Sequence, residues 1–147
     1  MYQRILIATD GSTLSRKAVG SGIKLAALTG AQVVALKVVP RYPVSYFEGG
    51  MTVSAKDVAK VEKQWAEAAL AVVEDVKVSA EAKGVKAKAV ITTSDLIAES
   101  IIATAKKHKC DLIVMASHGR RGLKRLLLGS ETVQVLTHSH VPVLVLR

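Results

Sequence analysis

Cysteine and aromatic residues are scarce in this sequence. Cys110 is the only cysteine, so the chain can form neither an internal disulfide nor a cysteine-based zinc site. The aromatic residues are one Trp, three Tyr and one Phe. Modules that bind single-stranded nucleic acid usually stack bases on aromatic rings. This scarcity argues against nucleic acid as a partner, although the formal net charge of +9 is compatible with a small polyanionic ligand.

Long apolar runs are lacking as well. No uninterrupted apolar run approaches the ~18 residues that a membrane-spanning helix needs. The first apolar stretch, Ile5–Ala8, is followed closely by Asp10 and is too short for the core of a signal peptide. We therefore expect a protein without a membrane segment that is located in the cytoplasm.

The composition is otherwise that of one compact domain. Hydrophobic residues make up 50% of the 147 residues and charged residues 22%, which is too apolar for a disordered chain. The length fits a single core of ordinary size. Because no linker, internal repeat or low-complexity segment divides the sequence, we expect one domain over residues 1–147.

Short apolar runs rich in valine and isoleucine alternate with segments of helical pattern. The expected strands are Ile5–Ala8, Val33–Val39, Ala87–Ile91, Leu112–Ala116 and Val141–Leu146. The expected helices are Thr13–Leu28, Ser54–Lys83, Asp95–Lys109 and Glu131–His138. Because strands and helices alternate strictly, the sequence predicts an α/β fold with an open five-stranded parallel sheet and helices on both faces.

The order of the strands follows from which apolar runs are interrupted. Lys88 breaks the third run, and Pro142 stands near the start of the fifth, as is typical of edge strands. The first, second and fourth runs are almost continuously apolar, as expected for strands that are buried on both faces. These features predict the strand order 3-2-1-4-5.

A ligand of such a sheet binds beyond the carboxyl ends of the strands, where the strand order reverses. This point lies between the first and fourth strands, next to the polar, glycine-bearing loops 8–12 and 117–122. The second loop leads to Gly129-Ser130 at the start of the last helix, where amide groups and the helix dipole favour phosphate. Neither a Walker A motif nor a G-x-G-x-x-G motif is present, so a nucleotide would need another cradle.

Several stretches of the sequence resemble the universal stress protein family, and together they cover essentially the whole chain. These stretches are residues 5–12, 111–119, 128–130 and 141–145. The ATP-binding branch of that family is marked by the motif G-x2-G-x9-G-[ST]. Here Gly119 is followed by nine residues and then by Gly129-Ser130, while Ala116 occupies the first glycine position. The resemblance implies a Rossmann-like sheet of the adenine nucleotide alpha hydrolase type and an ATP-binding function.

The resemblance also implies roles for individual residues. Asp10 would lie near the ribose, Ala8 would form the pocket floor, and the backbone of Val38 would face the adenine edge. The implied ATP site consists of Ala8, Asp10, Val38, Ala116, Gly119, Arg120, Arg121, Gly122, Gly129, Ser130 and Glu131. Residue type alone leaves Asp10 two further roles, an Asx turn ahead of Gly11-Ser12 or a ligand of Mg²⁺ that accompanies ATP.

Three hypotheses for the function remain open at this point. The first is an ATP-binding sensor or effector of a stress response, which is not a metabolic enzyme. The second is a dimeric interaction module of the same family that no longer binds nucleotide, and Ala116 in the motif supports it. The third is a slow ATPase, in which Arg120 and Arg121 act on the phosphates and His118 is the base.

The final strand is expected to form an interface with a second copy of the chain. Val143–Leu146 is an apolar run at a sheet edge, which favours pairing with another strand. The family resemblance implies the same contact, with the two last strands meeting across a two-fold axis. We therefore predict a homodimer; the sequence does not identify the further protein partner that a sensor would need.

Overall fold

A computed structural model describes residues 1–43, 54–118 and 128–147 of the chain. Strands and helices alternate through these ranges, as the sequence predicts. In chain order they are β1 (Arg4–Ala8), α1 (Thr13–Thr29), β2 (Gln32–Val39), α2 (Ala55–Glu81), β3 (Ala87–Thr93), α3 (Ile97–Lys107), β4 (Leu112–Ala116), α4 (Ser130–His138) and β5 (Val143–Leu146). No helix within the described ranges is long and apolar enough to cross a membrane.

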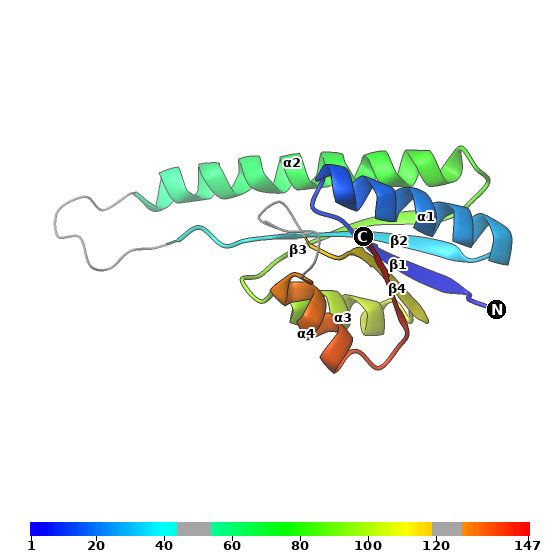
Figure 1. Cartoon of the computed structure of the whole chain (residues 1–147). Coiled ribbons are helices and arrows are strands. Elements are labelled where there is room, and N and C mark those ends of the chain that lie inside the picture. Colours follow the sequence, from blue (N-terminus) through cyan, green and yellow to red (C-terminus); the bar gives the residue numbers. More distant parts are fainter. Residues whose placement is uncertain (44–53, 119–127) are drawn as a thin grey trace.

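The strands form one parallel sheet in the order β3-β2-β1-β4-β5, which confirms the predicted order. Helices α1 and α2 lie on one face of the sheet, and α3 and α4 lie on the other (Figure 1). The strand order reverses between β1 and β4. After β1 the next strand, β2, is added on one side of this pair, and after β4 the next strand, β5, is added on the other side. The carboxyl ends of β1 and β4 are therefore the place to look for a ligand site.

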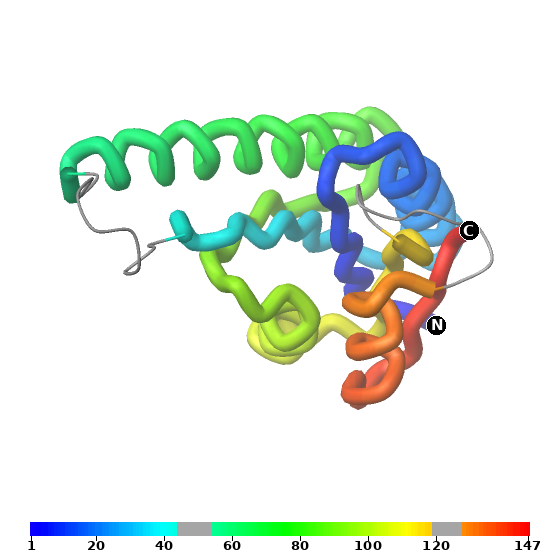
Figure 2. Tube along the Cα trace, turned by 60° about the vertical axis from the view of Figure 1, so that its left-hand side comes forward, coloured from blue at the N-terminus to red at the C-terminus, as the bar shows by residue number. Residues whose placement is uncertain are grey.

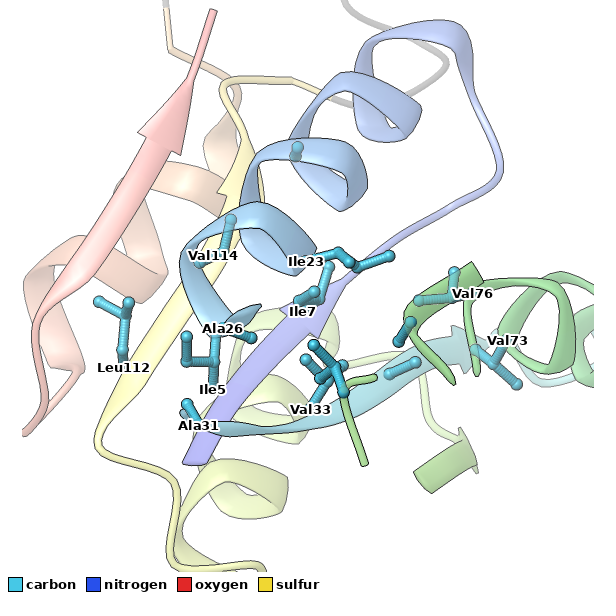
Figure 3. Packing of buried hydrophobic residues seen from close by; sticks show 14 of the residues in the cluster. Ile5, Ile7, Ile23, Ala26, Ala31, Val33, Val73, Val76, Leu112 and Val114 are labelled. Carbon is cyan, nitrogen blue, oxygen red and sulfur yellow. The ribbon is translucent and has the colours of Figure 1, made fainter. Parts of the chain in front are cut away.

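The core lies on both faces of β1. Ile5, Leu6 and Ile7 are fully buried, because this strand has neighbours on both sides and helices above and below. Ile5 and Ile7 pack with side chains from α1 and α2 (Figure 3), while Leu6 packs with side chains from α3 and α4. This alternation follows from the two-residue period of a strand and anchors the centre of the sheet.

Gly22 allows α1 to pack closely on the sheet. A Cβ atom at this position would lie 2.7 Å from Cδ1 of Ile7 and 3.5 Å from Cγ1 of Val114. Ile7 is fully buried, so its side chain has no space into which it can move. Because Gly22 has no side chain, α1 can lie close to β1 and β4. This close packing also fixes the position of the turn that precedes α1.

The start of α3 differs from the prediction. The helix begins at Ile97 and not at Asp95, whose Oδ1 accepts the N–H of Arg41 at 2.9 Å. A distant side chain caps the helix instead, because Oε2 of Glu131 in α4 accepts the N–H of Ala98 at 3.2 Å. This hydrogen bond ties the first turns of α3 and α4 together, and no local pattern in the sequence indicates it.

Candidate functional site

A cavity of about 160 Å³ lies where β1 and β4 end, at the predicted reversal point. It is lined by Ala8, Thr9, Asp10, Ser15, Leu36, Val38, Ile97, Ile101, Met115, Ala116, His118, Glu131 and Thr132. The start of α4 lies beside the end of β4 at this edge of the sheet (Figure 2), and the hydroxyl of Thr132 in α4 donates to the carbonyl oxygen of Ala116 in β4. The structure therefore brings residues from three strands and three helices, far apart in sequence, to one hollow.

Apolar side chains form the walls of this cavity. Leu36 and Val38 come from β2, Ile97 and Ile101 from α3, and Met115 from β4. A dry apolar cavity of roughly 150 Å³ is large enough for one benzene ring. The cavity therefore fits part of a flat aromatic base, and any polar groups attached to the base would have to lie at its opening.

The backbone of Val38 faces this cavity. The Leu36 carbonyl oxygen accepts the N–H of Thr9 at 2.9 Å, so the backbone polar groups of Leu36 point toward β1. Val38 is two residues further on, and the period of the strand makes its polar groups point the same way. Because β1 ends at Ala8, which is aligned with Leu36, the backbone of Val38 extends past the end of β1. Its N–H and carbonyl groups are thus directed at the crevice.

The turn between β1 and α1 is held by its own polar side chains. Oδ1 of Asp10 accepts the N–H of Ser12 at 2.9 Å, which is the Asx turn expected for this residue type. Gly11 has a φ of 80°, a conformation that favours glycine. The hydroxyls of Thr9 and Ser15 share a hydrogen bond of 3.0 Å. Asp10 nevertheless lines the cavity, so the turn also presents its carboxylate to the site.

Gly129 is the N-cap of α4, and Ser130 is the first residue of the helix. The helix thus begins one residue before the expected start at Glu131. Gly129 has a φ of −63°, so the backbone angle does not require glycine. A Cβ atom there would lie 3.2 Å from Cα of His118, a tight contact that a side chain could make only if the backbone of His118 shifted slightly. The N–H of Gly129 donates to the Ser117 carbonyl oxygen at 2.7 Å.

The N-terminus of α4 has no side-chain cap within the described ranges. The first amide groups of a helix have no acceptor inside the helix, so those of Ser130 and Glu131 suit an anion. Thr132, which is 1% exposed, fixes this end of the helix. Its hydroxyl lies 3.1 Å from the carbonyl oxygen of Ala116 and 2.9 Å from that of Ser117.

The structure gathers Ala8, Asp10, Val38, Ala116, Glu131 and, directly beside them, Gly129-Ser130 around this cavity. Glu131 lines the cavity, and its carboxylate also caps α3. Four other residues of the predicted site lie outside the described ranges. They are Gly119, Arg120, Arg121 and Gly122.

Sequence reasoning missed the walls that α3 supplies and a second hollow of about 420 Å³ next to the cavity. Lys17, Arg147 and His118 are among the residues that line this hollow, and His118 belongs to both. Nδ1 of His118 and the Ser117 hydroxyl share a hydrogen bond of 3.1 Å. Lys17 lies about one helical turn after the turn that joins β1 to α1. Helical periodicity could therefore have predicted that it lies at this edge of the sheet.

No group of three histidine, cysteine, aspartate or glutamate side chains in the described ranges is arranged to hold a metal ion. Asp10 is a carboxylate at the cavity, and a single carboxylate suits Mg²⁺ only when other ligands come from a bound phosphate or water. The described residues therefore fit a metal that arrives with a phosphorylated ligand, and they do not form a separate metal site.

Comparison with known proteins agrees with this geometry. The family model of the universal stress protein family matches residues 1–147. Universal stress protein MJ0531 of Methanocaldococcus jannaschii is 37% identical over 151 residues, which cover 100% of this chain and 83% of the relative. The solved structure of MJ0577, from the same organism, superposes with a TM-score of 0.84 at 29% identity, covering 99% of this chain and 96% of that one.

A more distant solved structure holds a ligand. It is a universal stress protein family protein from Arabidopsis thaliana with AMP bound, at a TM-score of 0.68 and 18% identity, covering 98% of this chain and 90% of that one. At this identity the similarity concerns the fold.

Proposed function

This chain belongs to the universal stress protein family, and we propose that it binds ATP in the cavity between β1 and β4 and acts as a sensor or effector in a stress response. The observation that carries the proposal is the apolar cavity at the reversal point of the sheet. An adenine base needs apolar walls for its faces and a few polar groups for its edge. Leu36, Ile101 and Met115 supply such walls, and the backbone of Val38 supplies the polar edge.

The ribose and the phosphates extend from the opening of the cavity in this proposal. The carboxylate of Asp10 accepts a ribose hydroxyl or contributes to a Mg²⁺ ion that comes with ATP. The amides of Ser130 and Glu131, with the hydroxyl of Ser130, donate to the phosphates. The sequence motif that ends at Gly129-Ser130 supports this direction, since it places glycine-rich backbone next to the same helix start.

Phosphate binding by the amide of Gly129 requires a change in the described arrangement. This N–H group donates to the carbonyl oxygen of Ser117, and that bond must break before the amide can reach a ligand. Donors that hold phosphates equally well before and during the reaction do not accelerate hydrolysis. Any turnover of ATP is therefore expected to be slow, in keeping with a sensor.

Calorimetric titration of ATP tests the proposal. Wild-type protein is expected to bind, and Ser130→Ala is expected to bind about 10- to 100-fold more weakly, since a hydrogen bond to a charged group contributes roughly 1.5–3 kcal/mol. The matched control is Ser79→Ala, an exposed serine on α2 whose hydroxyl bonds only to the carbonyl oxygen of Asp75. Equal loss in both variants would contradict a role of Ser130 in holding phosphate.

The variant Ala116→Gly distinguishes a protein that binds ATP from an interaction module that no longer binds it. Ala116 lines the cavity and is 6% exposed, so its methyl group occupies space at the base of the site. The variant is expected to bind ATP as tightly as the wild type or more tightly. Binding by this variant at millimolar ATP, without binding by the wild type, would favour the dimeric interaction module. Absence of binding in both would refute the ATP site.

We also propose that the chain forms a homodimer through β5. This strand is at the edge of the sheet and pairs only with β4 among the described strands. Leu144 is 39% exposed, whereas Val143 and Val145 pack partly into the core. A flat apolar edge of this kind is a template for pairing with another strand.

Leu144→Lys is expected to convert the dimer into a monomer on a sizing column, because the added charge would be buried in the interface. Leu28→Lys is the control, since Leu28 is 85% exposed near the end of α1 and does not belong to the edge strand. An unchanged elution volume for Leu144→Lys, or an equal change in both variants, would contradict the β5 interface.

A further inference from the structure

A basic cleft lies at the opposite end of the sheet from the cavity, at the amino ends of β1, β2 and β3. It has a volume of about 390 Å³, and its polar lining is Arg4, Gln32, Lys86, Lys88 and His108. We call it the amino-end cleft. Small-molecule sites typically have volumes of ~300–1,000 Å³, so this cleft is large enough for a ligand.

The pleat of the sheet places these polar residues on one face. Arg4 is aligned with Gln32, and Lys88 is aligned with Val34. Val34 packs in the cluster under α3 and α4, so Lys88 is on that same face of the sheet. Lys86 stands two residues earlier and shares this orientation. The amino end of an otherwise apolar sheet face thus carries three cationic side chains beside the end of α3.

The described residues that line the cleft include no acidic side chain to balance its three cations. Across the described ranges, no ion pair joins Arg4, Lys86 or Lys88 to a carboxylate. Asp111 stands outside the lining, where its two carboxylate oxygens accept the backbone N–H groups of Gln3 and Arg4 at 2.9 and 3.0 Å, and its charge offsets only part of the positive charge. Like charges held together in this way repel one another, and a bound anion would relieve the repulsion.

Residues at the end of α3 also belong to this positively charged region. Nη1 of Arg4 donates to the carbonyl oxygen of His108, which holds the guanidinium at the helix end. Burial lowers the pKa of His108, and the neighbouring charges of Lys88, Lys107 and Arg4 lower it further. Lys109 has a φ of 54°, which favours glycine, and it lines an adjoining hollow that also includes Arg4. Lys109 thus adds a further positive charge next to the cleft, although its backbone conformation is unfavourable for a residue other than glycine.

We propose that the amino-end cleft binds a compact oligophosphate, a small molecule with two or more linked phosphate groups. Lysine and arginine side chains that line one hollow suit the several charges of such a ligand. The described residues that line the cleft include no Phe, Tyr or Trp ring on which a nucleic-acid base could stack. The proposal is independent of the ATP site, since it concerns the other end of the sheet.

Histidine resonances test this proposal on the intact protein. Of the four histidines, His108 belongs to the amino-end cleft and His118 to the ATP cavity, so the imidazole NMR signals report the two sites separately. Titration with inorganic tripolyphosphate at low salt is expected to shift the His108 signals. It is also expected to raise the pKa of His108, because the anion offsets the charges of Lys88, Lys107 and Arg4.

The double variant Lys86→Gln/Lys88→Gln is expected to weaken the binding seen at His108 by about tenfold or more. The matched control, Lys56→Gln/Lys60→Gln, removes the same charge from exposed positions on α2 and is expected to change it less than about twofold. Three results would overturn the proposal: no shift of His108 at millimolar tripolyphosphate, equal weakening in both double variants, or citrate or an oligo-aspartate peptide binding as tightly as tripolyphosphate.

Discussion

Val38→Trp is expected to abolish measurable ATP binding while the protein stays folded. Val38 lines the cavity near its opening and is only partly buried, so an indole ring can turn into the hollow without displacing the centre of the sheet. A cavity of about 160 Å³ cannot hold both the indole and a purine. We expect the affinity for ATP to fall at least ~100-fold, which corresponds to about 2.7 kcal/mol.

Calorimetry measures the loss of affinity, and thermal unfolding monitored by circular dichroism measures whether the variant is folded. The control is Val78→Trp, because Val78 is 62% exposed on α2 and the same side chain is added there outside the cavity. Val38→Phe serves as a smaller substitution if the tryptophan variant is unstable. Affinity that stays at the wild-type value in a folded Val38→Trp protein would place the base elsewhere.

Thr132→Val is expected to lower the free energy of unfolding by about 1–3 kcal/mol. Valine has nearly the shape of threonine, so the change removes the hydroxyl and leaves the packing in place. That hydroxyl lies 3.1 and 2.9 Å from the carbonyl oxygens of Ala116 and Ser117, on a side chain that is 1% exposed. Because the bonds hold α4 against the end of β4, the variant is also expected to bind ATP more weakly.

Thr104→Val is the matched control for this prediction. Thr104 is also buried, at 5% exposure, but its hydroxyl donates only to the Ser100 carbonyl oxygen within its own helix. Urea unfolding of both variants gives the two changes in stability, and the loss is expected to be clearly larger for Thr132→Val. Equal losses would mean that the two contacts with the end of β4 contribute nothing specific.

The sheet was predictable because its central strands are marked in the sequence. The runs around Ile5–Ala8 and Leu112–Ala116 are continuously apolar, and Lys88 and Pro142 mark the edges. The start of α3 was not predictable in the same way. Its cap comes from Glu131, which is 33 residues away in sequence, and a side chain on another helix leaves no local signal.

The site was predictable where strand ends determine it. Ala8, Asp10 and Ala116 stand at or just beyond the ends of β1 and β4, so the topology alone brings them to the cavity. The walls from Ile97 and Ile101 depend on the rotation of α3 about its axis, which only the packed structure reveals. The same holds for Gly129, whose lack of a side chain reflects contact with the backbone of His118.

The pairing of β1 with β4 also has a consequence for synthesis on the ribosome. Ile5, Leu6 and Ile7 leave the ribosome well before their partners on β4, residues 112–114, which lie more than 100 positions later. Domains form as the chain emerges, and contacts between distant segments form slowly. Until β4 has been made, one edge of β1 has no partner and is open to other nascent chains. The segment at greatest risk of aggregation during synthesis is thus the one that ends up most deeply buried.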